Sequence, residues 1–150
     1  MSRAVEENNR RLLRARDAMD RTYAQPLDIP ALAAIACVSE AHFIRSFRAT
    51  FGETPHRYLQ RRRVERAMFL LRETGRSVTE ICLDVGFVSL GTFSRTFREI
   101  VGETPSDYRR GHGPIVAPHC VQLAAMRPLV EVEATIQSSS FGEAVVAIPP

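Results

Sequence analysis

The sequence contains no lysine and no tryptophan, and it has only three cysteines. Cys37, Cys82 and Cys120 cannot form a closed set of disulfides and lie in no C-x-x-C pair, so a zinc or redox site has little support. Because Cys37 and Cys82 sit in apolar stretches, we expect both to be buried thiols. No stretch approaches about 18 apolar residues, and residues 1–11 lack the apolar core of a secretion signal. We therefore expect a soluble, cytoplasmic protein with no membrane partner.

Positive charge comes from arginine alone, with 20 arginines against 17 acidic residues. Residues 1–110 hold 19 arginines and 14 acidic residues, a formal charge of +5, whereas residues 111–150 carry a charge of −2. A positive body suits a polyanionic partner, and the planar guanidinium can bind guanine edges or phosphates with two hydrogen bonds. A codon bias toward arginine across the genome would give the same composition, so composition leaves both explanations open.

One phrase occurs twice, 50 residues apart: HFIRSFRATFGETPHRYL at 42–59 and TFSRTFREIVGETPSDYR at 92–109. The matched positions are Phe43 with Phe93, Arg45 with Arg95, Phe47 with Phe97, Gly52 with Gly102, and Tyr58 with Tyr108. Upstream of these phrases the best match has an offset of 49 residues, so the second turn should be one residue longer. A duplication of this size predicts one structural unit built twice.

Apolar residues at helical spacing, together with capping residues, predict seven helices. They are expected at 5–24, 28–37, 40–51, 55–74 (ended by Gly75), 77–86, 89–101, and from 105 to about 108. The expected apolar stripes of the first two helices are Val5, Leu12, Ala15, Met19 and Tyr23, and then Leu32, Ile35 and Ala36. Each half of the repeat contains a short helix, a tight turn and a second helix, which is a helix-turn-helix.

The predicted fold is all-α and homeodomain-like, with two helix-turn-helix subdomains at about 28–52 and about 77–102. A long linker helix at about 55–74 joins them, and together they make a DNA-binding domain over about 8–110. Proline and glycine break up residues 111–150, which predict a mostly irregular C-terminal extension. Within this extension, residues 129–137 alternate loosely like a strand.

In a helix-turn-helix, the second helix enters the major groove of double-stranded DNA and its outward face reaches the bases. Rotation away from the core phenylalanines predicts two sets of DNA-contacting residues: Glu40, Ala41, Ile44, Arg45 and Arg48 in the first recognition helix, and Leu90, Gly91, Ser94, Arg95 and Arg98 in the second. Isolated arginines on a helix also occur as a simple solvated face, which is the alternative interpretation.

Each predicted contact has a chemical reason. Arg45 and Arg95 occupy equivalent positions and suit the O6 and N7 of guanine. Ala41 and Ile44 suit thymine methyl groups, Ser94 suits a base or a phosphate, and Arg48 and Arg98 suit phosphates. The run Arg61-Arg62-Arg63 either touches the DNA backbone or pairs with acidic residues. A linker helix of 20 residues would span about 30 Å, close to the ~34 Å of one turn of B-DNA, so both recognition helices could enter successive major grooves of an asymmetric site.

Two segments, GFVSLGTFSRTFREIVGETPSDYR at 86–109 and VSEAHFIRSFRATFGETPHRYLQRRRVERAMFLL at 38–71, carry a specific resemblance. Over about residues 10–110 the chain resembles the DNA-binding domain of the AraC/XylS family of bacterial transcription regulators. The resemblance implies an asymmetric promoter site and activation through contact with RNA polymerase. The chain is most similar to the small MarA/SoxS-like type, which lacks an N-terminal effector domain and acts as a monomer. It departs from those relatives at Ala41 and Ile44, where they carry bulky or polar residues.

Two further hypotheses follow from other features. The extension from Gly111 could bind a ligand, a partner or a second chain, since Ile115-Val116 and residues 129–136 are apolar. An alkyl-acceptor repair enzyme would need an activated cysteine beside a basic partner, and no such pair stands out. We therefore predict that the protein is not an enzyme, with no catalytic residue, metal ligand or cofactor.

Overall fold

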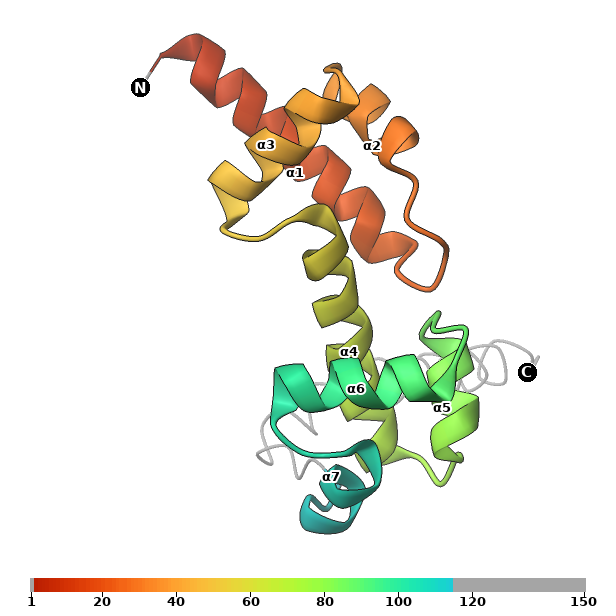
Figure 1. Ribbon diagram of the computed structural model, residues 1–150. Coiled ribbons are helices and arrows are strands. Elements are labelled where there is room, and N and C mark those ends of the chain that lie inside the picture. Colours follow the sequence, from red (N-terminus) through yellow and green to blue (C-terminus); the bar gives the residue numbers. More distant parts are fainter. Residues whose placement is uncertain (1, 115–150) are drawn as a thin grey trace, which may run out of the picture. The chain divides into compact units, whose positions relative to one another are not determined.

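The computed structural model describes residues 2–114 of the chain. Within this range there are seven α-helices and no strand, which confirms the predicted all-α fold. The helices are α1 (Arg3–Arg21), α2 (Ile29–Ala36), α3 (Glu40–Phe51), α4 (Pro55–Glu73), α5 (Val78–Asp84), α6 (Leu90–Val101) and α7 (Pro105–Gly111), as Figure 1 shows. From residue 115 onward the predicted extension, with its strand-like segment, lies outside the described residues.

Polar caps set the beginnings of the helices. Ser39 and Ser89 accept hydrogen bonds from the third residue of α3 and of α6, at 3.3 and 3.2 Å. Thr54 caps α4 in the same way (3.2 Å), with Pro55 at the first position, where a missing N–H costs nothing. Asp28 caps α2 by accepting from the N–H of Ala31 at 2.9 Å. These local bonds explain why the predicted starts of α2, α3, α4 and α6 are correct.

The buried side chains form two separate cores, one for each helix-turn-helix. The first core takes residues from α1, α2, α3 and the start of α4: Leu12, Ala15, Met19, Leu32, Ala33, Ala36, Phe43, Phe47, Tyr58 and Leu59. The second core takes residues from the rest of α4, from α5 and the turn after it, and from α6 and α7: Val64, Ala67, Leu71, Ile81, Cys82, Val85, Phe87, Phe93, Phe97 and Tyr108. Each phenylalanine buried in this way contributes about 1.5–3 kcal/mol by removal from water.

The linker helix α4 belongs to both units. Its first turns carry Tyr58, whose ring lies 5.6 Å from that of Phe47, just as Tyr108 of α7 lies 5.6 Å from Phe97. Its later turns place Val64, Ala67 and Leu71 in the second core at the same spacing as the three α1 residues, Leu12, Ala15 and Met19, of the first. Thus α4 is the last helix of the first unit continued into the first helix of the second (Figure 1).

The two turns differ in length, as the sequence predicts. The left-handed residue that ends the first helix is Cys37 (φ 57°) in one unit and Gly86 (φ 98°) in the other, an offset of 49 residues. The next residues, Val38 and Phe87, donate equivalent hydrogen bonds back to Ala33 and Cys82, at 3.1 and 3.0 Å. The second turn then adds one residue, Val88, before the cap Ser89.

Several predictions about burial are wrong. Cys37 is exposed, because α2 ends at Ala36 and the left-handed residue that follows leaves the buried stripe. Ile35 is 39% exposed, since the buried face of α2 follows Leu32, Ala33 and Ala36 instead. Val5 is 47% exposed because the buried face of α1 starts only at Leu12.

Several helix ends also differ from the prediction, including those of α5, which ends at Asp84, and α7, which runs on to Gly111. Helix α1 ends at Arg21, three residues early, because the backbone of Thr22 leaves the helical conformation (φ −119°, ψ 30°), and its hydroxyl donates to the carbonyl of Ala18 at 2.9 Å. Helix α4 ends at Glu73 and is followed by Thr74 in an extended conformation, so no left-handed glycine at position 75 terminates the helix. Among the described helices, none is both long and apolar enough to cross a membrane.

Candidate nucleic-acid interface

The phenylalanines fix which faces of α3 and α6 point outward. Phe43 and Phe47 on α3, and Phe93 and Phe97 on α6, are fully buried. Of the ten predicted DNA-contacting residues, nine are exposed: Glu40, Ala41, Ile44, Arg45, Arg48, Leu90, Gly91, Arg95 and Arg98. Ser94 is half-buried, one position from Phe93. The outward faces therefore combine arginine with small and apolar side chains, and their contact with DNA stays a prediction.

The described arginines differ in what their side chains bind. Arg61 and Arg62 bind acidic residues. Arg61 contacts Glu53 at 2.6 Å and Glu65 at 2.5 Å, and the hydrogen bond to Glu53 does most to raise the Arg61 pKa. Arg62 contacts Asp20 at 2.9 Å and Glu65 at 2.7 Å. Of the two interpretations left open for this run, pairing with acidic residues is the one observed for Arg61 and Arg62.

Two other arginines are bound to backbone carbonyls of the protein itself. Arg63 donates from Nε to the carbonyl of Tyr23 and from Nη2 to that of Gln25, both at 2.7 Å. Burial lowers the pKa of Arg63. Arg109 donates to the carbonyls of Leu71 (3.1 Å) and Arg76. Because these donors are used within the fold, the two side chains hold elements together.

The arginines of the recognition helices are not engaged in this way. Within residues 2–114, Arg45, Arg48 and Arg95 make no hydrogen bond or ion pair through their side chains, and Arg98 makes no ion pair. The charge of Arg98 adds only the smallest of several effects that lower the Asp107 pKa, after the hydrogen bonds from Thr104 and Arg110. Four unneutralised guanidinium groups on two equivalent helix faces can bind phosphates or guanine edges.

One large apolar residue exposed beside this surface is absent from the predicted set. Val88, the added residue of the second turn, is 94% exposed and precedes the cap of α6. Leu90, directly after that cap, is 44% exposed. Large apolar side chains with so much exposure beside a recognition helix suit contact with thymine methyl groups. The sequence held a signal for Val88, because the two repeats match at an offset of 49 residues before the turn and of 50 residues after it.

The cysteines offer no activated nucleophile in the part of the chain that the structure describes. Cys82 is buried, and burial raises the pKa of its thiol, which disfavours the reactive thiolate. Cys37 is exposed, and its sulfur has one weak partner, the carbonyl of Ile35 at 3.9 Å. Cys120 lies outside the described residues.

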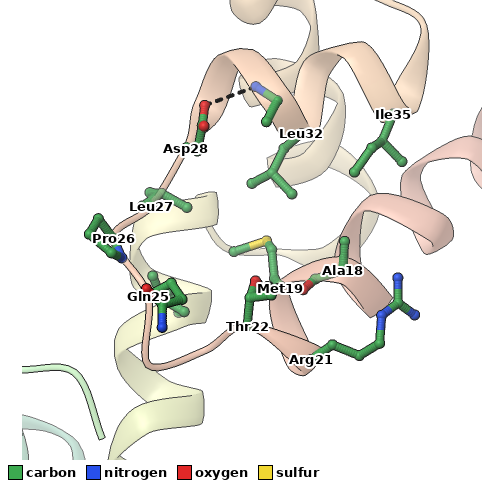
Figure 2. A pocket seen from close by; sticks show the side chains of 12 residues that line it. Ala18, Met19, Arg21, Thr22, Gln25, Pro26, Leu27, Asp28, Leu32 and Ile35 are labelled. Carbon is green, nitrogen blue, oxygen red and sulfur yellow. Dashed lines mark hydrogen bonds between the residues drawn. The ribbon is translucent and has the colours of Figure 1, made fainter.

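An apolar pocket of about 240 Å³ lies between the end of α1, the following loop and α2. Figure 2 shows Leu32 and Ile35 of α2 pointing toward Ala18 and Met19 of α1, with Asp28 bonded to the start of α2. None of the lining residues belongs to α3 or α6, so this pocket is separate from the predicted DNA-contacting faces.

Comparison with known sequences agrees with this geometry. The family described as a helix-turn-helix domain matches residues 32–111. The regulatory protein SoxS of Salmonella typhimurium is 40% identical over 91 residues, which cover 61% of this chain and 85% of SoxS. The regulator GbdR of Pseudomonas aeruginosa is 34% identical over 113 residues, covering 73% of this chain and 31% of GbdR. All of these matches are to regulators or DNA-binding domains.

Solved structures give the same result. The DNA-binding domain of AdpA, a global transcriptional factor crystallised with a target DNA, superposes with a TM-score of 0.63 at 31% identity, covering 67% of this chain and 90% of that one. A probable AraC family transcriptional regulator from Rhodopseudomonas palustris superposes with a TM-score of 0.65 at 27% identity, covering 70% of this chain and 99% of that one.

Proposed function

Since the chain belongs to the AraC-type helix-turn-helix family of DNA-binding transcription regulators, we propose that it binds an asymmetric promoter site through α3 and α6, placed in successive major grooves. The observation that carries this proposal is the set of four unpaired arginines on equivalent faces of the two helices. Within residues 2–114 most other arginines are paired with carboxylates or bound to carbonyls, although Arg66 of α4 also makes no ion pair.

The equivalent arginines have different neighbours in the two helices. On α3, Arg45 follows Ala41 and Ile44, whereas on α6, Arg95 follows Gly91 and Ser94. Apolar groups discriminate thymine methyl groups, while a serine hydroxyl bonds to polar base edges. Two recognition helices with different neighbours should read two different half-sites, and so a monomer would bind an asymmetric site.

The dimensions of α4 support binding in successive grooves. A helix of 19 residues is about 28 Å long. One turn of B-DNA measures about 34 Å, and recognition helices of a helix-turn-helix dimer lie at that separation. The fold of AdpA, solved on a target DNA, supports docking of this architecture on a duplex.

The test begins with selection of the preferred duplex from a random library, followed by titration measured by fluorescence anisotropy. Arg45→Ala and Arg95→Ala should each weaken binding by about 1–3 kcal/mol, roughly 5- to 150-fold, and should each relax sequence preference at one position. Arg10→Ala is the matched control, because Arg10 pairs with Glu7 on α1 and its loss removes the same formal charge. Wild-type affinity in both recognition-helix variants would exclude the proposed contacts.

Arg48 and Arg98 are proposed to contact phosphates. Their alanine variants should weaken binding to all duplexes alike, and each should reduce the slope of log affinity against log salt by about 1. A change in sequence preference would instead show that these residues contact bases.

We further propose that the bound monomer activates transcription by contacting RNA polymerase and that it acts in the cytoplasm. The support is the similarity to the regulatory protein SoxS. Transcription in vitro from a promoter carrying the selected site, with purified polymerase, distinguishes the outcomes: added protein should raise the transcript yield, whereas a fall would identify a repressor.

The alternative is a regulator whose residues 111–150 bind a ligand, a partner or a second copy of the chain. The apolar stretches at 115–116 and 129–136 favour it. Light scattering and anisotropy on the full chain and on residues 1–114 decide between the two. Equal mass per particle and equal DNA affinity would remove this alternative.

A further inference from the structure

Residues Tyr23–Gln25, which we call the bridge segment, join the two helix-turn-helix units away from the axis of α4. The segment follows α1 and so belongs to the first unit. Tyr23 packs against both hydrophobic cores. The bridge segment therefore touches the second unit directly, in addition to the covalent connection through α4.

Arg63 fastens the bridge segment to α4. Its Nε donates to the carbonyl of Tyr23 and its Nη2 to that of Gln25, each at 2.7 Å. The same guanidinium lies 5.7 Å from the centre of the Phe87 ring, which belongs to the second core. One half-buried side chain thus contacts both units, and its rigid planar fork fixes the two carbonyls relative to the ring.

The backbone at Gly86 shows how closely the units approach. A Cβ at this position would lie 2.6 Å from the carbonyl oxygen of Ala24 and 2.9 Å from its Cα. Gly52 and Gly102, which also end helices in the left-handed conformation, have no atom within 4 Å of such a Cβ. Gly86 therefore permits a contact of backbone against backbone, beyond its role in ending α5.

An ion pair also joins α6 to the first part of α4, and it is weak. Arg57 and Glu99 lie 3.6 Å apart, and both side chains are exposed. Exposed ion pairs of this kind add little stability. Beside the bridge segment lies a pocket of about 280 Å³, lined by Leu27, Leu59, Arg63 and Val88 among others, so the units are not packed tightly around it. Alongside Tyr23 and the Gly86–Ala24 contact, the Arg63 fork is then a directional polar connection between the two units.

We propose that Arg63 is a positioning residue that fixes the relative rotation of α3 and α6 and so sets the spacing of half-sites that the protein accepts. This inference rests on the proposed function, because it requires both helices to bind one duplex. Inserting one base pair between half-sites separates them by about 3.4 Å and rotates one against the other by about 35°. A rigid protein resists that rotation, and a protein without the Arg63 fork should resist it less, because only α4, Tyr23 and the Gly86–Ala24 contact then hold the units.

The test compares the affinity for the selected duplex with the affinity for duplexes that carry one base pair more or less between the half-sites. For the wild type the altered spacing should weaken binding at least about tenfold, the loss of one good base contact. In Arg63→Met, which keeps the length of the side chain and removes its donors, this penalty should shrink to about threefold or less, while affinity for a single half-site stays unchanged. Arg63→Lys can bond one carbonyl but has no fork, so its loss of affinity at the altered spacing should lie between those of the wild type and Arg63→Met.

Arg66→Met is the matched control, since Arg66 lies one turn further along α4, is exposed and stacks on Phe69. Arg66→Met should lose as much affinity at the altered spacing as the wild type does. If both Arg63 variants lose as much affinity at the altered spacing as the wild type does, the inference is overturned while the proposed function stands. If Arg63→Met does not fold, Arg63→Lys alone decides. Wild-type protein without any penalty would overturn the two-groove function and the inference together.

Discussion

The two helix-turn-helix units share the serine caps of their recognition helices and three core rings, but they differ in their turns and their outward faces. In the first unit, the left-handed residue is Cys37 and the outward face is carried by Ala41 and Ile44. In the second, Gly86 takes the left-handed position and Val88 lengthens the turn. The repeated features build the scaffold, and the differing ones distinguish what each unit can contact.

The largest expected effect tests whether the two cores are equivalent. Phe43→Ala and Phe93→Ala should each lower the free energy of unfolding by about 3–5 kcal/mol, because both rings are fully buried and leave a cavity. Urea denaturation followed by circular dichroism measures both values. If the two losses differ by more than about 2 kcal/mol, the cores are packed unequally despite their matched sequences.

An exchange of outward faces tests whether the differences specify the half-sites. The triple variant Glu40→Leu, Ala41→Gly, Ile44→Ser gives α3 the outward residues of α6 and leaves Arg45, the equivalent of Arg95, in place. It should select a direct repeat of the second half-site and lose about 1–3 kcal/mol of binding free energy for each base pair no longer matched. Selection from a random duplex library measures this, with Ala41→Gly alone as the control for the helix-weakening glycine. An unchanged consensus would refute the assignment.

Substitutions at the two left-handed residues, Gly86 and Cys37, should change the stability in opposite directions. Gly86→Ala should destabilise the fold by about 1–2 kcal/mol from its backbone conformation, with the collision against Ala24 adding to that cost. Cys37→Gly should stabilise the first unit by up to about 1 kcal/mol, since glycine adopts a φ of 57° without steric cost. Thermal unfolding measures both shifts. A destabilising Cys37→Gly would indicate that the Cys37 side chain contributes a packing interaction.

The matched tyrosines should differ through one hydrogen bond. Tyr58 donates to Asp20 at 2.7 Å, whereas within residues 2–114 the Tyr108 hydroxyl has no such partner. Tyr58→Phe should therefore cost about 1 kcal/mol of stability, and Tyr108→Phe close to none. Urea denaturation compares the two. Equal losses would show that the bond to Asp20 adds nothing beyond the ring.

A dependence of stability on pH is expected at the same residue, only in alkaline solution. Burial, followed by the hydrogen bond to Asp20, raises the pKa of Tyr58 to about 12 from its usual 10.0. Because the pKa of Tyr58 is higher in the folded than in the unfolded protein, protonated Tyr58 stabilises the fold fully below about pH 10. This stabilisation is lost as the pH rises toward 12. Ultraviolet titration of the phenolate measures the pKa, and Asp20→Asn should lower it. A pKa unaffected by that substitution would assign the shift to burial alone.

The sequence alone determined the parts of this protein that depend on near neighbours along the chain. Ser39, Ser89 and Thr54 bond to backbone groups three residues away, so their spacing predicts where helices begin. Phe43 and Phe47, one turn apart, predict the buried stripe and hence the outward face that holds Arg45. The all-α class, the duplication and the longer second turn follow from the same short-range signals.

Tertiary contacts decided the rest, because they join residues that are far apart in sequence. Arg63 bonds to carbonyls about forty positions away, and nothing in the run 61–63 distinguishes it from its neighbours, which pair with acids. Gly86 resembles any glycine at a helix end until Ala24 lies against it. Such contacts depend on how separately formed helices pack, and local spacing carries no information about that packing.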